Sequence, residues 1–503
     1  MLEAFYMVLP IAVAIVVLML SKNSVLSLLF GLISAAFVIA GSDMPLFMDT
    51  VGHSFKAVFY DRGVKVWNVA IMVFLPLLML ISVMMHISGG LDGLISFLKK
   101  RIKTKKGAEF TIFLLGILIY IDGYFNAVIL GNISRAFARS HKVSRAKLAY
   151  IVDSTAAPIC PLSPISSWGA AILGIIGASI TKAGATVSAP VLFFKMLPYQ
   201  VFTYMVLIVI LLTIFGNLKI GFMAEIERGL ADDDFDRSNS YLEREKKETG
   251  GKISNFFYPI ISLLVVTSVI VLVEGATNSK SMNLVTIIAN SNLALAMVYG
   301  AIFTLVTFYL KIMKEHKLCE VFENAKKPLH ETVKTILLLI IAWAMINAID
   351  TMGLGAFLSR FVKAHDISAT LLPLILFEIS AILSFASGTS WGTFYLFLPV
   401  AFSLGIGFDI DHAAVFMAAV ISGSVFGDNC SLISDTTIIS ANATNCHLDM
   451  HYVTQIPYAL IAGVATAVAF LLLGLSSSLI LAYGCALLSL WIFVKGSKRF
   501  YSA

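Results

Sequence analysis

Charged residues are scarce in this chain: Asp, Glu, Lys and Arg make up 13% of its 503 residues, whereas 58% are hydrophobic. Soluble globular domains carry about 25% charged residues. The composition therefore excludes a soluble domain and predicts a polytopic membrane protein whose main partner is the lipid bilayer. In membrane proteins, Lys and Arg gather beside the helices on the cytoplasmic side. The net charge of +6 is explained in this way, and we expect no nucleic-acid partner.

Cysteine pairs are also missing. The five cysteines are an odd number, lie scattered in apolar surroundings and show no CxxC spacing. This excludes a disulfide framework or a zinc site, and we expect buried, inert thiols. The N-terminal segment MLEAFYMVLPIAVAIVVLML lacks a basic region and an obvious small-residue cleavage site. We therefore expect a retained first helix and not a signal peptide.

Long apolar runs are abundant, and about eleven segments approach the roughly 20 residues that a membrane span needs. Nine are continuous: 4–21, 24–41, 66–88, 190–217, 255–274, 291–310, 334–350, 454–475 and 476–494. Two more, 148–180 and 413–443, are apolar at their ends and polar in the middle. We expect each of these two to be one span that is broken at mid-membrane.

Two further segments do not fit single spans. Segment 109–133 has two short apolar arms around IDGYFN, and basic runs flank it on both sides. Because both basic flanks should be cytoplasmic, we expect a re-entrant hairpin that enters from the cytoplasm. Segment 370–405 has the same form around SFASGTSWG, with few basic residues beside it. We expect it to be a hairpin that enters from the outside.

The order of these elements repeats: three spans, a hairpin, a broken span and a span. Residues 1–217 form the first predicted repeat, and residues 255–475 form the second. A charged cytoplasmic linker (218–254) joins them, and an extra helix with a basic tail (476–503) follows. Each unit crosses the membrane an odd number of times, so the second should be inverted. The predicted fold is an all-α polytopic membrane protein with inverted repeats, and such folds bind their substrate near the bilayer midplane.

The first broken span reads VDSTAAPICPLSPISSWG. Its three prolines cannot all lie inside one α-helix, because each removes a hydrogen-bond donor and clashes with the preceding turn. The backbone should therefore open, and non-helical backbone at this depth is tolerated only inside protein or beside a water-filled cavity. The side chains expected to face the opening are Asp153, Ser154, Thr155 and Ser163.

The second broken span and the two hairpin tips add more polar residues. The second broken span supplies Asp428, Asn429, Ser431, Ser434, Asp435 and Thr436, and the tips supply Asp122, Asn126, Ser387, Gly388, Thr389 and Ser390. Hard oxygen ligands suit a small hard cation, and an intramembrane carboxylate is by default a functional candidate. We predict Na+ binding at Asp153, Asp428 and Asp435. A carboxylate that holds either Na+ or a proton, but not both at once, would couple the movement of Na+ to that of H+, because the two ions compete for it.

Structural interpretations compete for single residues. A Ser or Thr in a membrane helix often bonds to its own backbone or to a neighbour, and Asp428 or Asp435 could cap a half-helix. Taken together, the two polar clusters favour a binding site.

Several motifs resemble the NhaC family of sodium/proton antiporters: DSTAAPICPLSPISSWGA, FASGTSWGT, VFGDNCSLISDTTIISA and TQIPYA. The resemblance covers about residues 66–475. It implies the ion-transporter superfamily fold, a homodimer with an elevator-like moving domain, a prokaryotic cytoplasmic (inner) membrane location, and no cofactor beside the transported Na+ and H+. The sequence departs from the family pattern at Asp122-Gly123, where two adjacent acids are frequent, and at Leu432, where many members have proline.

Our first hypothesis is therefore a Na+/H+ antiporter. The alternative is a Na+- or H+-coupled transporter or exchanger of an amino acid or small carboxylate, of the malate/lactate kind, because a pocket with fewer acids could hold a small organic solute. We expect no enzymatic activity, since neither broken span has a histidine that could serve as a base beside Ser163 or Ser431.

Overall fold

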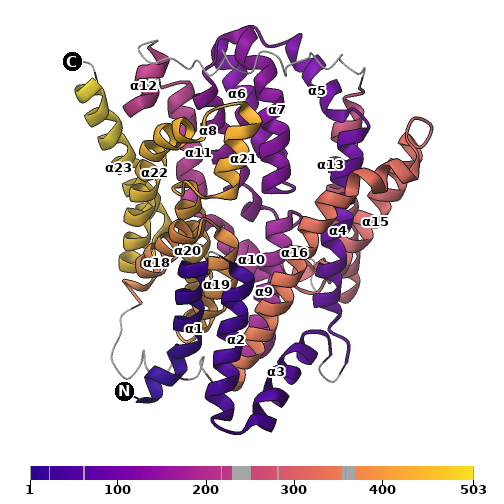
Figure 1. Cartoon of the computed structure of the whole chain (residues 1–503), viewed down its shortest axis with the longest axis vertical. Coiled ribbons are helices and arrows are strands. Elements are labelled where there is room, and N and C mark those ends of the chain that lie inside the picture. The colour runs from indigo at the N-terminus through magenta and orange to yellow at the C-terminus, as the bar shows by residue number, and fades with distance from the viewer. Residues whose placement is uncertain are drawn as a thin grey trace.

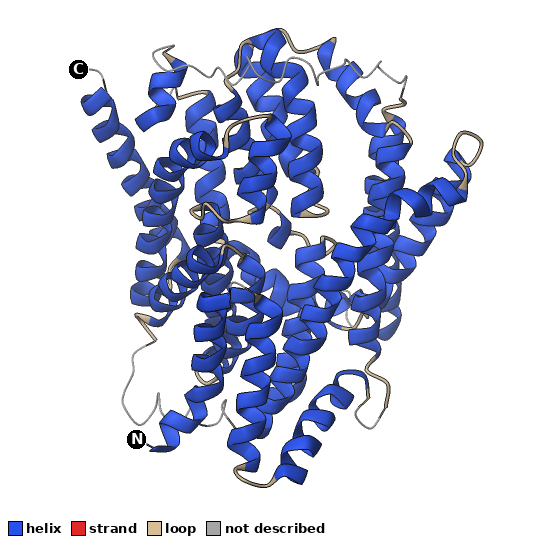
Figure 2. Ribbon diagram, viewed as in Figure 1, coloured by secondary structure: helices blue, strands red, loops and turns tan. Residues whose placement is uncertain are grey.

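The computed structural model describes residues 2–501 except 22, 61–62, 217, 229–250, 280–282, 354–356 and 358–368. Within these residues the chain is helical, with turns and one isolated bridge between Tyr60 and Val64, and it forms no strand (Figure 2). This confirms the predicted all-α class. Most of the predicted linker 218–254 lies outside the described residues.

Twelve α-helices lie in the described part of the first half. They are α1 (Leu2–Ser21), α2 (Ser24–Ala40), α3 (Met44–Phe59), α4 (Val66–Ile87), α5 (Gly90–Lys99), α6 (Lys105–Leu118), α7 (Gly123–His141), α8 (Arg145–Ala156), α9 (Ser167–Ala183), α10 (Ala189–Met196), α11 (Val201–Ile214) and α12 (Gly221–Glu227).

The second half contains α13 (Ser254–Asn278), α14 (Leu284–Ala289), α15 (Leu293–Ile312), α16 (Leu318–Thr351), α18 (Leu372–Ser387), α19 (Ser390–Ile406), α20 (Ile410–Asn429), α21 (Asp435–Thr444), α22 (Leu448–Ser476) and α23 (Leu479–Tyr501).

Eight of the described segments are long and apolar enough to cross a membrane, or nine if the pair α10–α11 counts as one. That pair corresponds to the expected span 190–217, which is not straight: it bends by 42° at a short turn that contains Pro198. Proline lacks a backbone donor and so interrupts a helix. The other two expected spans correspond to α1 and α2, which are shorter apolar helices.

Helix extends beyond the expected spans in two places. The expected span 334–350 is part of α16, which begins at Leu318 and continues without a break to Thr351. Similarly, the expected span 454–475 is part of α22, which begins at Leu448. In both cases amphipathic or polar sequence continues a helix beyond the apolar stretch, because helical periodicity does not require a uniformly apolar run. The connection between α4 and α6 contains a separate helix, α5.

Both broken spans are interrupted in the structure. Between α8 and α9, residues 157–166 form turns and a short 3-10 helix, Cys160–Leu162. Between α20 and α21, residues 430–434 are non-helical. Each second half-helix begins after a serine whose side chain accepts a backbone N–H: Ser166 from Gly169 at 2.8 Å, and Ser434 from Thr437 at 3.4 Å. Such capping is the usual way to start a helix.

The half-helices of the two halves of the chain are interleaved. α21 packs against α7 and α8, and α9 packs against α19. Figure 1 places α6, α7, α8 and α21 in the upper half of the view, and α9 and α19 in the lower half. Elements from both halves of the chain therefore meet near the middle of the molecule, where both helix breaks lie. The predicted repeats 1–217 and 255–475 stay a prediction.

Candidate functional site

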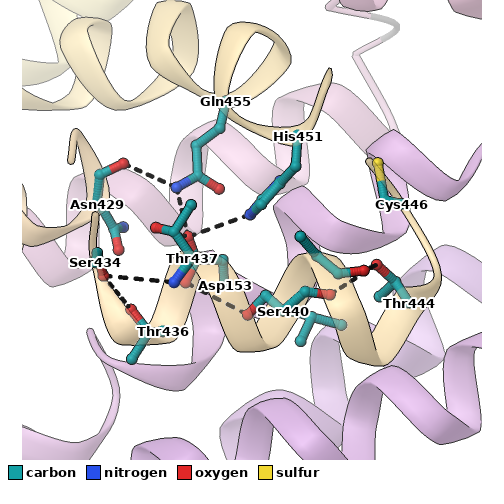
Figure 3. Close-up of polar contacts among 12 residues, drawn as sticks. Asp153, Asn429, Ser434, Thr436, Thr437, Ser440, Thr444, Cys446, His451 and Gln455 are labelled. Carbon is teal, nitrogen blue, oxygen red and sulfur yellow. Dashed lines mark hydrogen bonds and ion pairs between the residues drawn. The ribbon is translucent and has the colours of Figure 1, made fainter. Parts of the chain in front are cut away.

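A buried carboxylate, that of Asp153 on α8, lies at the centre of a polar cluster (Figure 3). Its side chain is 0% exposed. Oδ2 accepts hydrogen bonds from Gln455 Nε2 at 2.6 Å and from Thr437 Oγ1 at 3.0 Å. Ser440 Oγ donates to Oδ1 at 3.4 Å, and His451 Nε2 lies 3.4 Å from Oδ2. Four side chains thus converge on one carboxylate.

Helical spacing explains this convergence. Thr437 and Ser440 are three residues apart on α21, whereas His451 and Gln455 are four residues apart on α22, so each pair lies on one helix face. A short turn joins the two helices, and Asn445 ends α21 in the left-handed conformation (φ 58°). Figure 3 shows these faces lying around the carboxylate.

Gln455 also connects the cluster to the second helix break. Its Nε2 donates to the carbonyl oxygen of Asn429 at 2.8 Å. The side-chain amide of Asn429 is 1% exposed, and neither its oxygen nor its nitrogen has a hydrogen-bond partner. The Oε1 atom of Gln455 is likewise buried and unbonded. Buried polar atoms are normally paired, so these amide oxygens are available to a ligand.

A second buried carboxylate, Asp428, precedes this break in the last turn of α20 and is 4% exposed. Ser390 Oγ lies 2.9 Å from its Oδ2 and 3.1 Å from the carbonyl oxygen of Ser424. Ser384 Oγ donates to the same carbonyl at 2.6 Å. The end of the α18–α19 hairpin is therefore hydrogen-bonded to the helix that carries Asp428.

The other two predicted acids have different surroundings. Asp435 begins α21, is exposed, and accepts a hydrogen bond from Tyr124 Oη at 3.0 Å. Asp122 caps α7 by accepting the Phe125 N–H at 3.0 Å, and its Oδ2 accepts from Ser167 Oγ at 2.6 Å. Asp122 thus ties the tip of the α6–α7 hairpin to the start of α9.

No described Lys or Arg pairs with Asp153 or Asp428. A buried charge without a partner is costly, and inside a membrane it marks a functional site by default. Across the described ranges, no group of three or more His, Cys, Asp or Glu side chains is placed to hold a metal ion. Asp153, Asp428 and Asp435 instead have separate sets of neighbours.

Several predicted residues bond to backbone near their own positions. Thr155 Oγ1 donates to Ile151 O at 2.7 Å, and Ser387 Oγ donates to Leu383 O at 2.8 Å. The oxygens of Ser163 and Thr389 accept backbone N–H groups two residues further on, from Ile165 and Trp391. Their described bonds have the local, structural character that single hydroxyls in membrane helices often show.

Others connect elements. Ser431 Oγ donates to Phe385 O at 2.9 Å, and Asn126 Nδ2 donates to Gly116 O at 2.8 Å and Thr155 O at 3.2 Å. The remaining predicted hydroxyls lie at the breaks: those of Ser434 and Thr436 are 3.0 Å apart, and that of Ser154 is buried without a partner.

Gly388 meets a steric requirement at the second hairpin tip. Its φ is +69°, and a Cβ added there would lie 2.7 Å from the carbonyl oxygen of Ile433. Only glycine adopts this conformation at low cost while allowing another backbone to approach so closely. The hairpin tip therefore packs directly against the second helix break.

Sequence reasoning missed four residues of the central cluster: Thr437, Ser440, His451 and Gln455. Thr437 and Ser440 belong to the motif that was singled out, and Gln455 belongs to TQIPYA. His451 lies just before the expected span 454–475, in the first turn of α22. The i, i+4 spacing of His451 and Gln455 was the signal that both residues share one helix face.

A separate ionic cluster connects α6, α8 and α12. Lys147 Nζ lies 2.8 Å from Glu109, and both side chains are buried. Glu227 accepts from Lys105 Nζ at 2.7 Å and from Ser144 Oγ at 2.7 Å. Burial alone would raise the pKa of Glu227, but these hydrogen bonds and the lysine charges outweigh it and lower the pKa below its ordinary value.

Comparison with known proteins identifies a family that matches more than half of the chain. Residues 159–475 match the Na+/H+ antiporter family. The chain is 28% identical over 505 residues to an uncharacterized protein of Haemophilus influenzae, with 99% of this chain and 96% of that protein covered. It is 27% identical over 162 residues to an uncharacterized Na+/H+ antiporter of the same organism, covering 32% and 34% of the two chains.

A further match is shorter: 32% identity over 96 residues with the malate-2H+/Na+-lactate antiporter of Bacillus subtilis, covering 19% and 20% of the two chains. Two solved transporters have a similar fold. The Alcanivorax borkumensis YdaH transporter has a TM-score of 0.58 at 13% identity, covering 86% and 88% of the two chains. Neisseria gonorrhoeae MtrF has a TM-score of 0.57 at 14% identity, covering 86% of each.

Proposed function

Because the chain belongs to the Na+/H+ antiporter family, we propose that this membrane protein exchanges Na+ for H+ as a secondary active transporter. The residues proposed to bind the ions are Asp153 and Asp428, with oxygens from Thr437, Ser440 and Asn429 completing the site. His451 and Gln455 hold the Asp153 carboxylate in place.

One observation supports this assignment above the others: two carboxylates are buried without a described Lys or Arg partner. These are Asp153 and Asp428, and His451 Nε2 lies 3.4 Å from Asp153 Oδ2. The buried amide oxygens of Asn429 and Gln455 also accept no hydrogen bond. Buried carboxylates in such surroundings are stabilised by a cation. Na+ or a proton each supplies the missing positive charge, and hard oxygen ligands suit Na+.

Competition provides the coupling. An ionised carboxylate attracts Na+, whereas a protonated one has lost the charge that holds the ion. If Asp153 or Asp428 carries either Na+ or a proton through the membrane, but not both, each ion drives the other in the opposite direction. The hydroxyls of Thr437 and Ser440 can donate to the empty carboxylate or turn their oxygens to the bound ion.

Alternating access would expose this site to one side at a time. The two helix breaks and the hairpin tip at Gly388 meet near the middle of the molecule, where fold families with inverted repeats place their sites. We propose that the hairpins and broken spans move as one body, in an elevator-like manner, against the other helices. We further propose a homodimer in the cytoplasmic (inner) membrane of a prokaryote.

The test is transport by purified protein in proteoliposomes. A pH gradient is imposed, and lumenal pH is followed on addition of Na+, Li+ or K+. We expect Na+ or Li+ to dissipate the gradient. Asp428→Asn should abolish this activity, whereas Asp411→Asn, a matched change at an exposed acid that pairs with Lys195, should retain it. Equal activity of both variants would contradict the proposal.

A second candidate is a coupled exchanger of a small carboxylate. It is favoured by the match of 96 residues to the malate-2H+/Na+-lactate antiporter of Bacillus subtilis. The same proteoliposomes distinguish the two candidates. If Na+ and Li+ alone leave the gradient intact, but malate or lactate moves in an ion-dependent manner, the exchanged species is a carboxylate.

A further inference from the structure

A second candidate site lies away from the carboxylates. A cavity of ≈ 370 Å³ opens beside the N-terminal end of α4, and α3, α9, α10, α16 and the turn before α15 also contribute to its wall. It shares no lining residue with the cluster around Asp153 and Asp428. No step of the proposed ion exchange uses it.

Lysine side chains contribute to the wall of the cavity. Lys65 and Lys182 both line it, and no Asp or Glu is among the described residues of its wall. Lys65 already interacts with another group, so Lys182 is the cation available to a ligand. Lys182 Nζ lies 3.9 Å from Asp350 Oδ2, but Asp350 is 44% exposed and stands outside the wall. A long, half-exposed ion pair of this kind is weak, so Lys182 remains able to attract an anion.

Hydrogen-bond donors without partners also favour an anionic ligand in this cavity. The indole Nε1 atoms of Trp67 and Trp343 and the Oγ atom of Ser188 are buried and unbonded, and all three side chains line the cavity. An indole nitrogen can only donate, and Trp343 is 1% exposed. Leaving buried donors unpaired is costly, so a ligand that accepts hydrogen bonds would stabilise them.

Ser188 contributes in another way. It precedes α10 as the N-cap residue, but its side chain forms no cap hydrogen bond. The first N–H groups of α10 therefore lack that partner at the cavity wall. A helix N-terminus carries partial positive charge and favours an anionic group, and here it acts beside Lys182.

The size and the apolar part of the wall indicate the kind of anion. The indole rings lie beside Val66 and Pro190, and the volume is at the lower end of the range of about 300–1,000 Å³ for small-molecule pockets. A Cβ on Gly177 would lie 2.6 Å from Trp67 Nε1, so this glycine lets the indole pack closely against α9. A bare inorganic ion would leave most of this space and apolar surface unused.

We propose that this cavity binds a small organic carboxylate, with the carboxylate group at Lys182 and the Trp67 N–H and the carbon skeleton against the indole rings. The site does not depend on the proposed exchange of Na+ and H+. It connects α9–α10 with α4 and α16, so an occupied cavity would hold these two groups of helices together.

Binding is tested by tryptophan fluorescence of the purified full-length protein, titrated with the potassium salts of lactate and malate. Lactamide serves as the uncharged analogue of lactate, and KCl controls for ionic strength. We expect a saturable change with at least one carboxylate and no such change with lactamide or KCl. A saturable change with lactamide as well, or none with either carboxylate, would overturn the proposal.

Variants locate the site. Removing one charge-assisted contact in Lys182→Gln should weaken binding roughly 10- to 100-fold. Lys195→Gln, at a lysine outside the cavity that pairs with Asp411, should bind like the unmodified protein. If both variants bind equally, the ligand is elsewhere.

Two further variants separate this site from the ion site. Trp67→Phe keeps an aromatic ring, removes the N–H and should weaken binding even if a lysine variant fails to fold. Asp153→Asn should bind the carboxylate normally while losing ion exchange. Loss of carboxylate binding in a folded Asp153→Asn protein would place the ligand at the carboxylate cluster and contradict the assignment to this cavity.

Discussion

The Thr437 hydroxyl offers a sharp test of the ion site. It donates to Asp153 Oδ2 at 3.0 Å, and its side chain is 1% exposed. Valine has nearly the shape of threonine but lacks the hydroxyl. Thr437→Val therefore removes one hydrogen bond to a buried carboxylate, and one oxygen available to a bound ion, with little change in packing volume.

The magnitude follows from the contact. Losing the hydroxyl oxygen as an Na+ ligand weakens binding, whereas losing its hydrogen bond to the empty carboxylate partly offsets this effect. A contact between a polar group and a charged group contributes about 1.5–3 kcal/mol, and each 1.4 kcal/mol corresponds to a tenfold change in affinity. Gln455 still donates to the same Oδ2 at 2.6 Å, so the lower part of this range applies. We expect the Na+ concentration for half-maximal exchange to rise about 10- to 30-fold.

The assay is Na+-dependent dissipation of a pH gradient in proteoliposomes, measured over a range of Na+ concentrations. The matched control is Thr466→Val on α22, where the hydroxyl bonds only to Ala462 O of its own helix at 2.7 Å and the side chain is 0% exposed. This variant should have a half-maximal concentration close to that of the unmodified protein. Equal shifts in the two variants would refute the role of Thr437.

Three further predictions concern stability, measured as the thermal unfolding midpoint in detergent. The pKa of Glu227 lies below its ordinary value of 4.5, so its stabilising contribution is complete above about pH 4.5 and is lost as pH falls through the lowered pKa. Glu227→Gln should therefore lower the unfolding midpoint at pH 7, and this loss should shrink below pH 4.5. A loss that does not change with pH would contradict this. Gly388→Ala should cost at least about 1–2 kcal/mol because of its positive φ, whereas Gly484→Ala, which meets nothing within 4 Å, should not destabilise. Lys147→Met should cost about 3–5 kcal/mol by leaving Glu109 buried and unpaired, and adding Glu109→Gln should recover part of that loss; no recovery would argue against the pair.

The sequence was sufficient to predict the elements that interrupt the membrane helices. Three prolines cannot fit one helix, so the break after α8 was foreseen. The break after α20 lacks proline and was inferred from its polar residues alone. Both predictions rest on local chemistry, which a single sequence shows directly. The bend at Pro198 was missed because the apolar run around it is continuous and long enough to span.

Tertiary contacts were harder to predict. Asp153 was selected as a buried acid, but sequence alone could not tell that its partners come from α21 and α22. Asp122 was predicted among the polar residues of the binding site, and its role there stays a prediction. Sequence alone did not show that its two oxygens accept hydrogen bonds from the Phe125 N–H and from Ser167 Oγ, which connect the hairpin tip to the start of α9.

The proposed exchange requires that the same buried carboxylates hold either Na+ or a proton. The most direct measurement is proton release from purified protein in weakly buffered detergent solution when Na+ is added, with choline as the control cation. We expect saturable proton release on Na+ binding, lost in Asp153→Asn or Asp428→Asn and retained in Asp411→Asn. Saturable Na+ binding without proton release, or equal release from all three variants, would contradict it.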